Sequence, residues 1–358
     1  QGDSYRIIDN DVADAVTGSF SGLAEGGTVA ASGNGTVLTA SYLGGTGNDV
    51  TLTAPINAAP VVSNLDGDSV TFTQGSGAIL LDFGTNATVT DGDSADFAGG
   101  NVTVSILANG VSGEDVLGIA NQGTGAGQIG LSGSDVTYQG TVIGTWTGGS
   151  AGADLVISLN ANATAAAVQA LVRNLNYSNS NATNGIDQAD RTLRVTLNDG
   201  DGGTSSSADI TVSVVETVAP TTVSIQVDDT ALAAGETTTV TITFSEAVTG
   251  LAIGDFTLAN GTLSNLATGD GGITWTATLT PAAGVEAAGN LITLDNSGYT
   301  DLAGNAGSGT TDSNSYAVDT LRPTASIVVA DSALAAGETS TVTITFSEAV
   351  TGLGLGDF

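Results

Sequence analysis

The stretch ALAAGETTTVTITFSEAVTGLAIGDF occupies residues 231–256 and holds the pattern that decides the fold. Within it, at 237–244, Val240, Ile242 and Phe244 alternate with threonines. Successive side chains of a β-strand point to opposite faces, so this segment has one apolar face and one polar face. That period of two, rich in β-branched residues, predicts a half-buried strand.

The same stretch returns 102 residues later, at 333–358, with changes at only three of its 26 positions. One repeat is therefore about the size of an immunoglobulin-like β-sandwich. Four further segments of the first copy show strand patterns, with clusters of Gly, Asn and Asp between them: 222–227, 273–281, 291–296 and 315–320. Several short strands separated by turns favour a sandwich or barrel.

The block at 57–217 is longer and contains one helical pattern. In residues 162–177, Val168, Leu171, Val172 and Leu175 follow the spacing i, i+3, i+4, i+7, and Asn162 or Thr164 could cap the helix. We expect a short amphipathic helix that packs on a sheet. Strand patterns occupy the rest of the block at 69–73, 101–107, 154–159, 191–197 and 208–216.

Scarce prolines divide the chain into four parts, because Pro55 with Pro60, Pro220 and Pro323 interrupt the strand patterns. The predicted fold class is all-β, with tandem β-sandwich modules and one short helix. The predicted parts are a C-terminal remnant of a β-rich module, a longer β-sandwich, an Ig-like β-sandwich and the first part of a second, incomplete repeat: 1–54, 57–217, 220–321 and 322–358. We expect either a window from a longer array or a half-module that another chain completes.

Composition excludes several classes of function. The 358 residues include 37 acidic and five basic side chains, all five of them Arg, for a net charge of -32. Such a chain repels nucleic acid and anionic lipid surfaces. Without Cys or His it forms no disulfide, thiolate metal site or His-based catalytic group, and without Lys it forms no Lys–Asn cross-link. No segment approaches the roughly 20 apolar residues that span a bilayer, and QGDSYRIIDND at the start lacks the features of a signal peptide.

The motifs VTITFSEAVTGLAIGDF, LDNSGYTDLAGNAG and SYAVDTLRPTASI resemble the bacterial Ig-like repeats of giant surface proteins. The block with TVTDGDSADFAGGNVTVSI and RTLRVTLNDGDGGTSSSADITVSVVE is similar to the cadherin-like modules of such proteins. The resemblance to large repetitive adhesins, of the RTX/VCBS type, implies an extracellular, multi-domain chain that often binds calcium. The glycine-rich nonapeptide calcium array of that type does not occur in this sequence, so the export route stays open.

Acidic clusters are the candidate metal ligands. Calcium takes six to eight oxygen ligands, and a D-x-D turn can direct two carboxylates at one point. Two such turns occur, DGDSAD at 91–96 and NDGDGG at 198–203, and a weaker set lies near the Ig-like boundaries. The alternative is that these are solvated turn acids. The predicted Ca²⁺ ligands are Asp91, Asp93, Asp96, Asp199, Asp201, Asp229 and Asp319.

The sequence predicts a structural and adhesive segment of a secreted bacterial surface protein, a string of β modules that calcium stiffens. Its expected partners are neighbouring modules of the same chain, copies of itself and an unidentified surface ligand, with neither nucleic acid nor membrane insertion. Two alternatives stay open: a self-assembling filament, sheath or S-layer subunit, and an array of carbohydrate-binding modules. We expect no enzymatic activity, and we expect Trp146 and Trp275, which lie in strand-like segments, to be packed.

Overall fold

The computed structural model describes residues 4–8, 19–30, 37–44, 49–54, 57–183 and 185–358. The chain divides into two compact units, one of residues 1–182 with 186–216 and the other of 183–185 with 217–358. We describe each unit by itself.

Unit 1 begins with a four-stranded antiparallel sheet in the order β1-β4-β3-β2. Its strands are β1 (Ser4–Ile8), β2 (Thr28–Ala30), β3 (Val37–Gly44) and β4 (Asp49–Thr53). Ala40 and Val50 are buried in it, whereas Tyr5 and Ile7 on β1 are exposed. The described residues of this sheet therefore bury little apolar surface.

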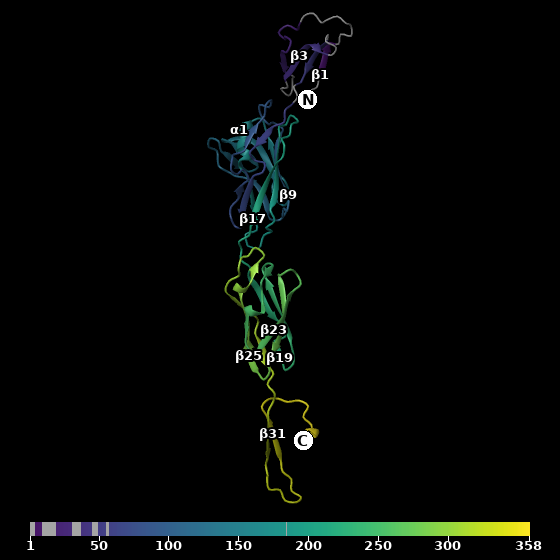
Figure 1. Cartoon of the computed structure of the whole chain (residues 1–358), viewed down its shortest axis with the longest axis vertical. Helices are drawn as coiled ribbons and strands as arrows, with labels where there is room; N and C mark the ends of the chain where they lie inside the picture. The colour runs from purple at the N-terminus through teal and green to yellow at the C-terminus, as the bar shows by residue number, and fades with distance from the viewer. Residues whose placement is uncertain (1–3, 9–18, 31–36, 45–48, 55–56, 184) are drawn as a thin grey trace. The chain divides into compact units, whose positions relative to one another are not determined.

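The rest of unit 1 is built on an eight-stranded sheet in the order β11-β12-β13-β14-β9-β16-β17-β6 (Figure 1). Only β17 and β6 pair in parallel. The strands are β6 (Ser69–Thr73), β9 (Asn101–Ala108), β11 (Ile129–Ser132), β12 (Asp135–Tyr138), β13 (Thr141–Gly148), β14 (Leu155–Leu159), β16 (Arg191–Asn198) and β17 (Ala208–Val215). Two smaller sheets complete the unit: β10 (Asp115–Ile119) with β15 (Leu175–Asn179) and β7 (Ile79–Leu80), and β5 (Val61–Ser63) with β8 (Thr88–Thr90).

Alternation along the strands produces the core of unit 1. Along β16 every second side chain from Arg191 to Leu197 is buried, and along β17 the same holds from Ala208 to Val214. Apart from Arg191, these side chains share one apolar cluster with residues of β10, β15 and the helix. Within it the rings of Phe72 and Tyr177 meet edge to face, with centroids 5.5 Å apart. Trp146 packs against the same cluster.

The predicted helix is α1 (Ala165–Val172), and Thr164 caps it by accepting a hydrogen bond from the amide of Ala167. Val168, Leu171 and Val172 face the core as expected. The prediction was wrong at its C-terminal end, because Leu175 is the first residue of β15 rather than part of the helix. Its side chain reaches the same core from a strand, so the spacing alone could not locate the end. No helix in the described ranges is long and apolar enough to cross a membrane.

Unit 2 contains a four-stranded sheet in the order β18-β20-β24-β23. Its strands are β18 (Thr222–Val227), β20 (Thr238–Phe244), β23 (Gly261–Thr268) and β24 (Thr274–Pro281). The remaining small sheets are formed by β19 (Ala231–Ala233), β25 (Glu286–Asn290) and β29 (Tyr316–Asp319), by β22 (Phe256–Leu258), β26 (Ile292–Asp295) and β28 (Thr310–Asp312), and by β21 (Val248–Thr249) and β27 (Thr300–Asp301). Short 3-10 turns lie at Ile253–Asp255 and Asn296–Gly298.

The opening stretch of the sequence is the centre of the unit 2 core. On β20, Val240, Ile242 and Phe244 are buried, and the intervening Thr241 and Thr243 lie on the other face. The rings of Phe244 and Tyr299 meet edge to face, with their centroids 4.7 Å apart. Trp275 packs against this core, as expected. These layered sheets and their shared cores confirm the all-β sandwich prediction.

The second copy of the repeat forms a two-stranded sheet of β30 (Ala325–Val329) and β31 (Val342–Phe346), followed by a 3-10 turn at Leu355–Asp357 (Figure 1). Its register matches that of the first copy: Ile327 faces Ile344 as Ile225 faces Ile242. Every residue of β30 is exposed.

Candidate functional site

The first predicted calcium turn, residues 91–96, connects β8 to β9. One carboxylate oxygen of Asp91 accepts hydrogen bonds from the amides of Asp93 and Ser94, both at 3.2 Å. Its other oxygen is buried and has no hydrogen-bond partner among the described residues. Asp93 accepts from the amide of Ala58 at 2.9 Å, and Asp96 from the amide of Ala98 at 3.0 Å. The carboxylates therefore hold the turn through backbone amides.

The second predicted turn, residues 198–203, connects β16 to β17. Asp199 is fully buried, and one of its oxygens accepts from the amides of Asp201 and Gly203 at 2.9 and 2.8 Å. Its other oxygen accepts from the Asn57 side chain at 2.7 Å. Asp201 itself is exposed. Asp199 thus fixes the turn, and Asp201 is the more available carboxylate.

The structure brings these two turns together. A Cβ on Gly200 would lie 2.1 Å from the carbonyl oxygen of Ala98, so the two backbones are in direct contact. Residues 57 and 58 also contact both turns, because Asn57 bonds to Asp199 and Ala58 to Asp93. The five acids are neighbours but do not form a set of three whose carboxylate oxygens lie within 4.8 Å of one another.

The other two predicted ligands, Asp229 and Asp319, do not lie in these turns. Asp229 is exposed and accepts a hydrogen bond from the amide of Ala231 at 2.9 Å. Asp319 is the exposed last residue of β29 and pairs in register with Glu286. In the described part of the chain, neither residue joins a group of three close carboxylates.

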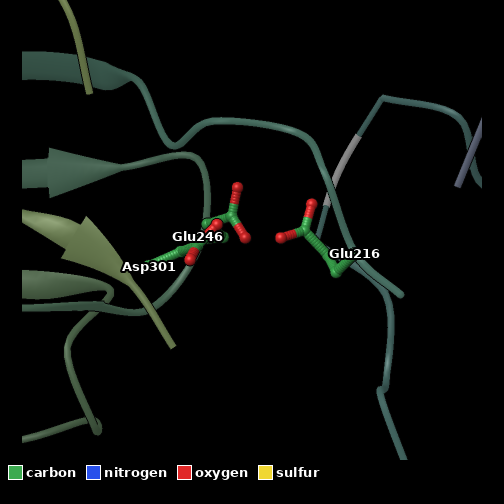
Figure 2. A group of neighbouring side chains, drawn as sticks. All are labelled: Glu216, Glu246 and Asp301. Atoms are coloured by element: carbon green, nitrogen blue, oxygen red, sulfur yellow. The ribbon is translucent and has the colours of Figure 1, made fainter. Parts of the chain in front are cut away.

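A different set of acids forms such a group, which we call the carboxylate triplet: Glu216, Glu246 and Asp301 (Figure 2). Each offers one oxygen, and these three oxygens all lie within 4.8 Å of one another. Glu216 and Asp301 are buried, and Glu246 is half-buried. Figure 2 shows the Glu216 carboxylate directed towards the other two. This is the only such group found in the residues that the structure describes.

Local structure explains how the triplet forms. Glu246 lies in the turn between β20 and β21, and Asp301 is paired with Val248 across the β21–β27 ladder. The Asp301 carboxylate also closes the 301–305 turn, accepting from the amide and the side-chain nitrogen of Asn305, both at 2.8 Å. Glu216 follows β17 directly and precedes Thr217, where unit 2 resumes.

The triplet fits calcium. Calcium–oxygen distances are about 2.3–2.6 Å, so two oxygens on opposite sides of one ion lie about 5 Å apart. Three oxygens within 4.8 Å can therefore share one ion. The donors are all carboxylates, the hard ligands that calcium prefers. Bringing three of them together also costs electrostatic free energy, which a divalent cation offsets.

The sequence analysis did not predict this triplet. Glu246 recurs as Glu348 in the second copy, and Asp301 lies in the stretch DNSGYTDLAGN. The sequence feature that could have pointed to the triplet is Glu246, because the same acid recurs in both copies within a segment that is otherwise apolar and rich in Thr. Glu216 carries no signal of its own.

A second buried polar group stabilises unit 1. The Asp115 carboxylate contacts the Arg191 guanidinium at 3.2 Å, and both side chains are almost wholly buried. Asp115 also accepts from the Tyr177 hydroxyl and the Asn179 side chain. Burial, and then the hydrogen bond to Asp115, raise the pKa of Tyr177 well above its usual range. Arg191 also donates to the carbonyl oxygens of Asp187 and Ala189, so the pair holds the 187–190 segment against β10.

Part of the chain matches a known protein family. Residues 216–318 match the bacterial Ig-like domain family, and residues 319–358 match it a second time. All three acids of the triplet lie in the first match, and the second match covers β30 and β31. No curated protein matches the chain.

Solved structures similar to this chain include three bacterial proteins. The Escherichia coli adhesin FdeC is 15% identical, and the match covers 84% of this chain and 78% of that chain with a TM-score of 0.26. The D00-D0 domain of intimin is 13% identical, and the match covers 73% of this chain and 99% of that chain with a TM-score of 0.23. The Yersinia pseudotuberculosis adhesin InvE is 11% identical, and the match covers 72% of this chain and 58% of that chain with a TM-score of 0.19. These TM-scores are too low to support an inference about the fold or function of this chain. The family match at 216–358 is therefore what the comparisons contribute.

Proposed function

We propose that this chain is a structural and adhesive segment of an extracellular bacterial surface protein, without enzymatic activity, in which calcium stiffens a string of β modules. The carboxylate triplet within the Ig-like match is the observation that carries the proposal. The net charge of -32 supports it, because a chain with this excess of acid is stabilised by divalent counter-ions.

Calcium would act mechanically at the triplet. Glu246 and Asp301 belong to two loops of unit 2, and Glu216 lies one residue before the chain continues into that unit. An ion held by all three would tie the incoming chain to these loops. It would also offset the repulsion between their charges. Without the ion, the incoming chain would be freer to move.

A second calcium position in the proposal is the pair of neighbouring turns in unit 1. Asp91 and Asp201 carry carboxylate oxygens that do not serve the hydrogen bonds of the turns. Asp93, Asp96 and Asp199 already accept backbone amides, which leaves their remaining lone pairs for an ion. Asp229 and Asp319, by contrast, would each contribute one isolated exposed carboxylate.

Two other roles receive less support. A carbohydrate-binding module needs an exposed aromatic platform, but Trp146 and Trp275 both pack against the cores. A filament or S-layer subunit would need contacts between copies of the chain. The RTX/VCBS assignment stays a prediction, and the export route stays open.

Thermal unfolding in calcium and in chelator tests the proposal. For a dissociation constant near 0.1 mM, 10 mM calcium is about 100 times that value and stabilises the folded protein by about 2.7 kcal/mol. The expected rise in melting temperature is about 10 °C for a unit of this size. In parallel, chelation should increase the radius of gyration measured by X-ray scattering.

Matched variants locate the effect. Asp301→Asn combined with Glu246→Gln should abolish the calcium-dependent rise in unit 2. Glu348→Gln makes the same change in the second copy, outside the triplet, and should keep the rise. An equal rise in all three proteins would place calcium elsewhere, and no rise in any of them would end the calcium proposal. Attachment of chain-coated beads to host cells or to abiotic surfaces, with and without calcium, tests the adhesive part.

A further inference from the structure

Unit 1 contains a cavity of about 400 Å³ between the end of β9, the start of β10 and the loop that joins β13 to β14. It is lined by residues 106–112, by Asp115 and Leu117, and by four residues of the 149–154 loop. Ligand pockets in proteins have volumes of about 300–1,000 Å³, so this cavity can take a small molecule or one long side chain. None of its residues belongs to the proposed calcium sites.

Close backbone contacts fix the shape of the cavity. The amide of Leu117 donates to the carbonyl oxygen of Gly149 at 2.7 Å, and a Cβ on Gly149 would lie 2.3 Å from the carbonyl oxygen of Leu117. A Cβ on Gly152 would lie 3.0 Å from the Cβ of Ser112. The loop therefore packs directly on the segments that form the opposite wall, so the fold itself forms the cavity.

The buried carboxylate in the lining is already satisfied. Asp115 is 4% exposed, and its Oδ1 accepts from the side chains of Tyr177 and Asn179. Its Oδ2 accepts from the amide of Val111 at 2.7 Å and from the Arg191 guanidinium, which also offsets its charge. A carboxylate has about four acceptor sites, so Asp115 holds the wall of the cavity in place and has none left for a ligand.

The remaining polar side chains of the lining offer free acceptors. Asp154, Ser112 and Asn109 are all exposed, and in the described part of the chain neither Asp154 nor Ser112 makes a side-chain hydrogen bond. The side-chain nitrogen of Asn109 donates to the carbonyl oxygen of Asp190 at 2.8 Å, which leaves its side-chain oxygen as an acceptor. No Arg lines the cavity. The lining therefore favours a ligand that donates hydrogen bonds and carries a positive charge.

Apolar side chains form the rest of the wall. Ile106 and Val111 are half-buried, and Leu107 is 49% exposed. A lysine side chain matches both parts of the lining, because an aliphatic four-carbon stem carries an ammonium with three donors and no acceptor. The chain itself contains no Lys, so such a side chain comes from another molecule, and the net charge of -32 favours the approach of a cation.

We infer that this cavity binds a lysine side chain of a partner polypeptide. The stem packs on Ile106, Leu107 and Val111, and the ammonium donates to the acceptors of Asp154, Asn109 and Ser112. This interaction goes beyond the proposed mechanical role of calcium and does not depend on it.

Titration of the full 358-residue chain with Nα-acetyl-lysine methylamide, in a calcium chelator, tests the inference. Amide chemical shifts report where the probe binds. We expect shifts in residues 106–112 and 149–154, with a dissociation constant on the order of 1 mM because a ligand this small makes few contacts. Nα-acetyl-norleucine methylamide keeps the aliphatic stem but lacks the ammonium, and it should bind at least about tenfold more weakly.

Two chain variants make the test specific. Asp154→Asn removes the carboxylate but keeps the size of the side chain, and it should raise the dissociation constant about fivefold. Asp135→Asn is the matched control, because it removes one acid from β12, outside the cavity, and it should leave the dissociation constant close to that of the wild type.

A second probe identifies the source of the ammonium. n-Butylamine carries the same ammonium and stem without a peptide backbone. Equal or weaker binding of n-butylamine supports a lysine of a polypeptide, whereas tighter binding would contradict that occupant.

Three results would overturn the inference. The first is unchanged amide shifts in residues 106–112 and 149–154 at about 10 mM probe, which is about ten times the expected dissociation constant. The second is a set of shifts spread over acidic residues outside the cavity, which would mean that the probe binds by charge alone. The third is equal affinity of the wild type and Asp154→Asn for the lysine probe.

Discussion

Replacement of Arg191 by Met is the sharpest test of how unit 1 is held together. The Arg191 side chain is fully buried, and its Nε lies 3.2 Å from the Asp115 carboxylate. The substitution keeps most of the apolar volume but leaves Asp115 as a buried charge without its cation. Removal of one partner from a buried pair costs about 3–5 kcal/mol. The lost donation to the carbonyls of Asp187 and Ala189 acts in the same direction.

The expected loss of melting temperature is large. For a unit of 150–250 residues, each kcal/mol shifts the melting temperature by about 2–4 °C, so the loss is about 6–20 °C. Urea denaturation followed by Trp fluorescence measures the free energy of unfolding directly. A Trp275→Phe background leaves Trp146 as the reporter, and Trp146 packs against the core of unit 1.

Arg194→Met is the matched control on the same strand. Arg194 binds Asp209 through two short hydrogen bonds of 2.7 and 2.8 Å, so its geometry is better than that of Arg191. Both side chains of that pair are about 40% exposed, and solvent screens an exposed ion pair, so Arg194→Met should cost far less stability than Arg191→Met. If the two variants lose the same stability, burial is not what makes the Arg191 pair important, and the reasoning fails.

Three further predictions concern the same two units. The pKa of Tyr177 is raised in the folded state, so its contribution to stability is complete below the unfolded pKa of about 10 and declines as the pH rises above that value. Tyr177→Phe should therefore flatten the alkaline side of a curve of unfolding free energy against pH. An unaltered curve would mean that ionisation of Tyr177 does not cause the alkaline loss of stability. Thr164→Ala removes the α1 cap and should cost about 1 kcal/mol in urea denaturation, whereas Thr164→Ser should be close to wild type. Gly200→Ala should destabilise unit 1 more than Gly67→Ala does, since both have a positive φ but only the Cβ at 200 meets backbone, at 2.1 Å from the Ala98 carbonyl oxygen; equal melting temperatures would mean that the two turns are not in rigid contact.

Much of the fold could be predicted from the sequence because strand patterns are local. Ser69–Thr73 and Thr222–Val227 match the expected strands at both ends, and Thr238–Phe244 differs by one residue. The second layer of unit 1 was not predicted. Strands such as Asp115–Ile119 and Leu175–Asn179 are short and polar in part, and they are defined by their partners rather than by their own pattern.

The candidate site was predictable only in part, because metal ligands meet through tertiary structure. The D-x-D turns were visible from spacing, and the structure places the two turns side by side. The triplet joins acids that are 30 and 55 residues apart in sequence, at positions 216, 246 and 301. The proximity of Glu246 and Asp301 depends on the β21–β27 ladder, which has only two residue pairs and leaves almost no trace in the sequence.

Calorimetric titration of the full chain with calcium tests the central proposal most directly. We predict binding with a dissociation constant of about 0.1–1 mM, the range of extracellular calcium modules. The heat assigned to the triplet should disappear in Asp301→Asn with Glu246→Gln and persist in Glu348→Gln. Absence of calcium binding at 10 mM, or identical titrations for all three proteins, would contradict the account.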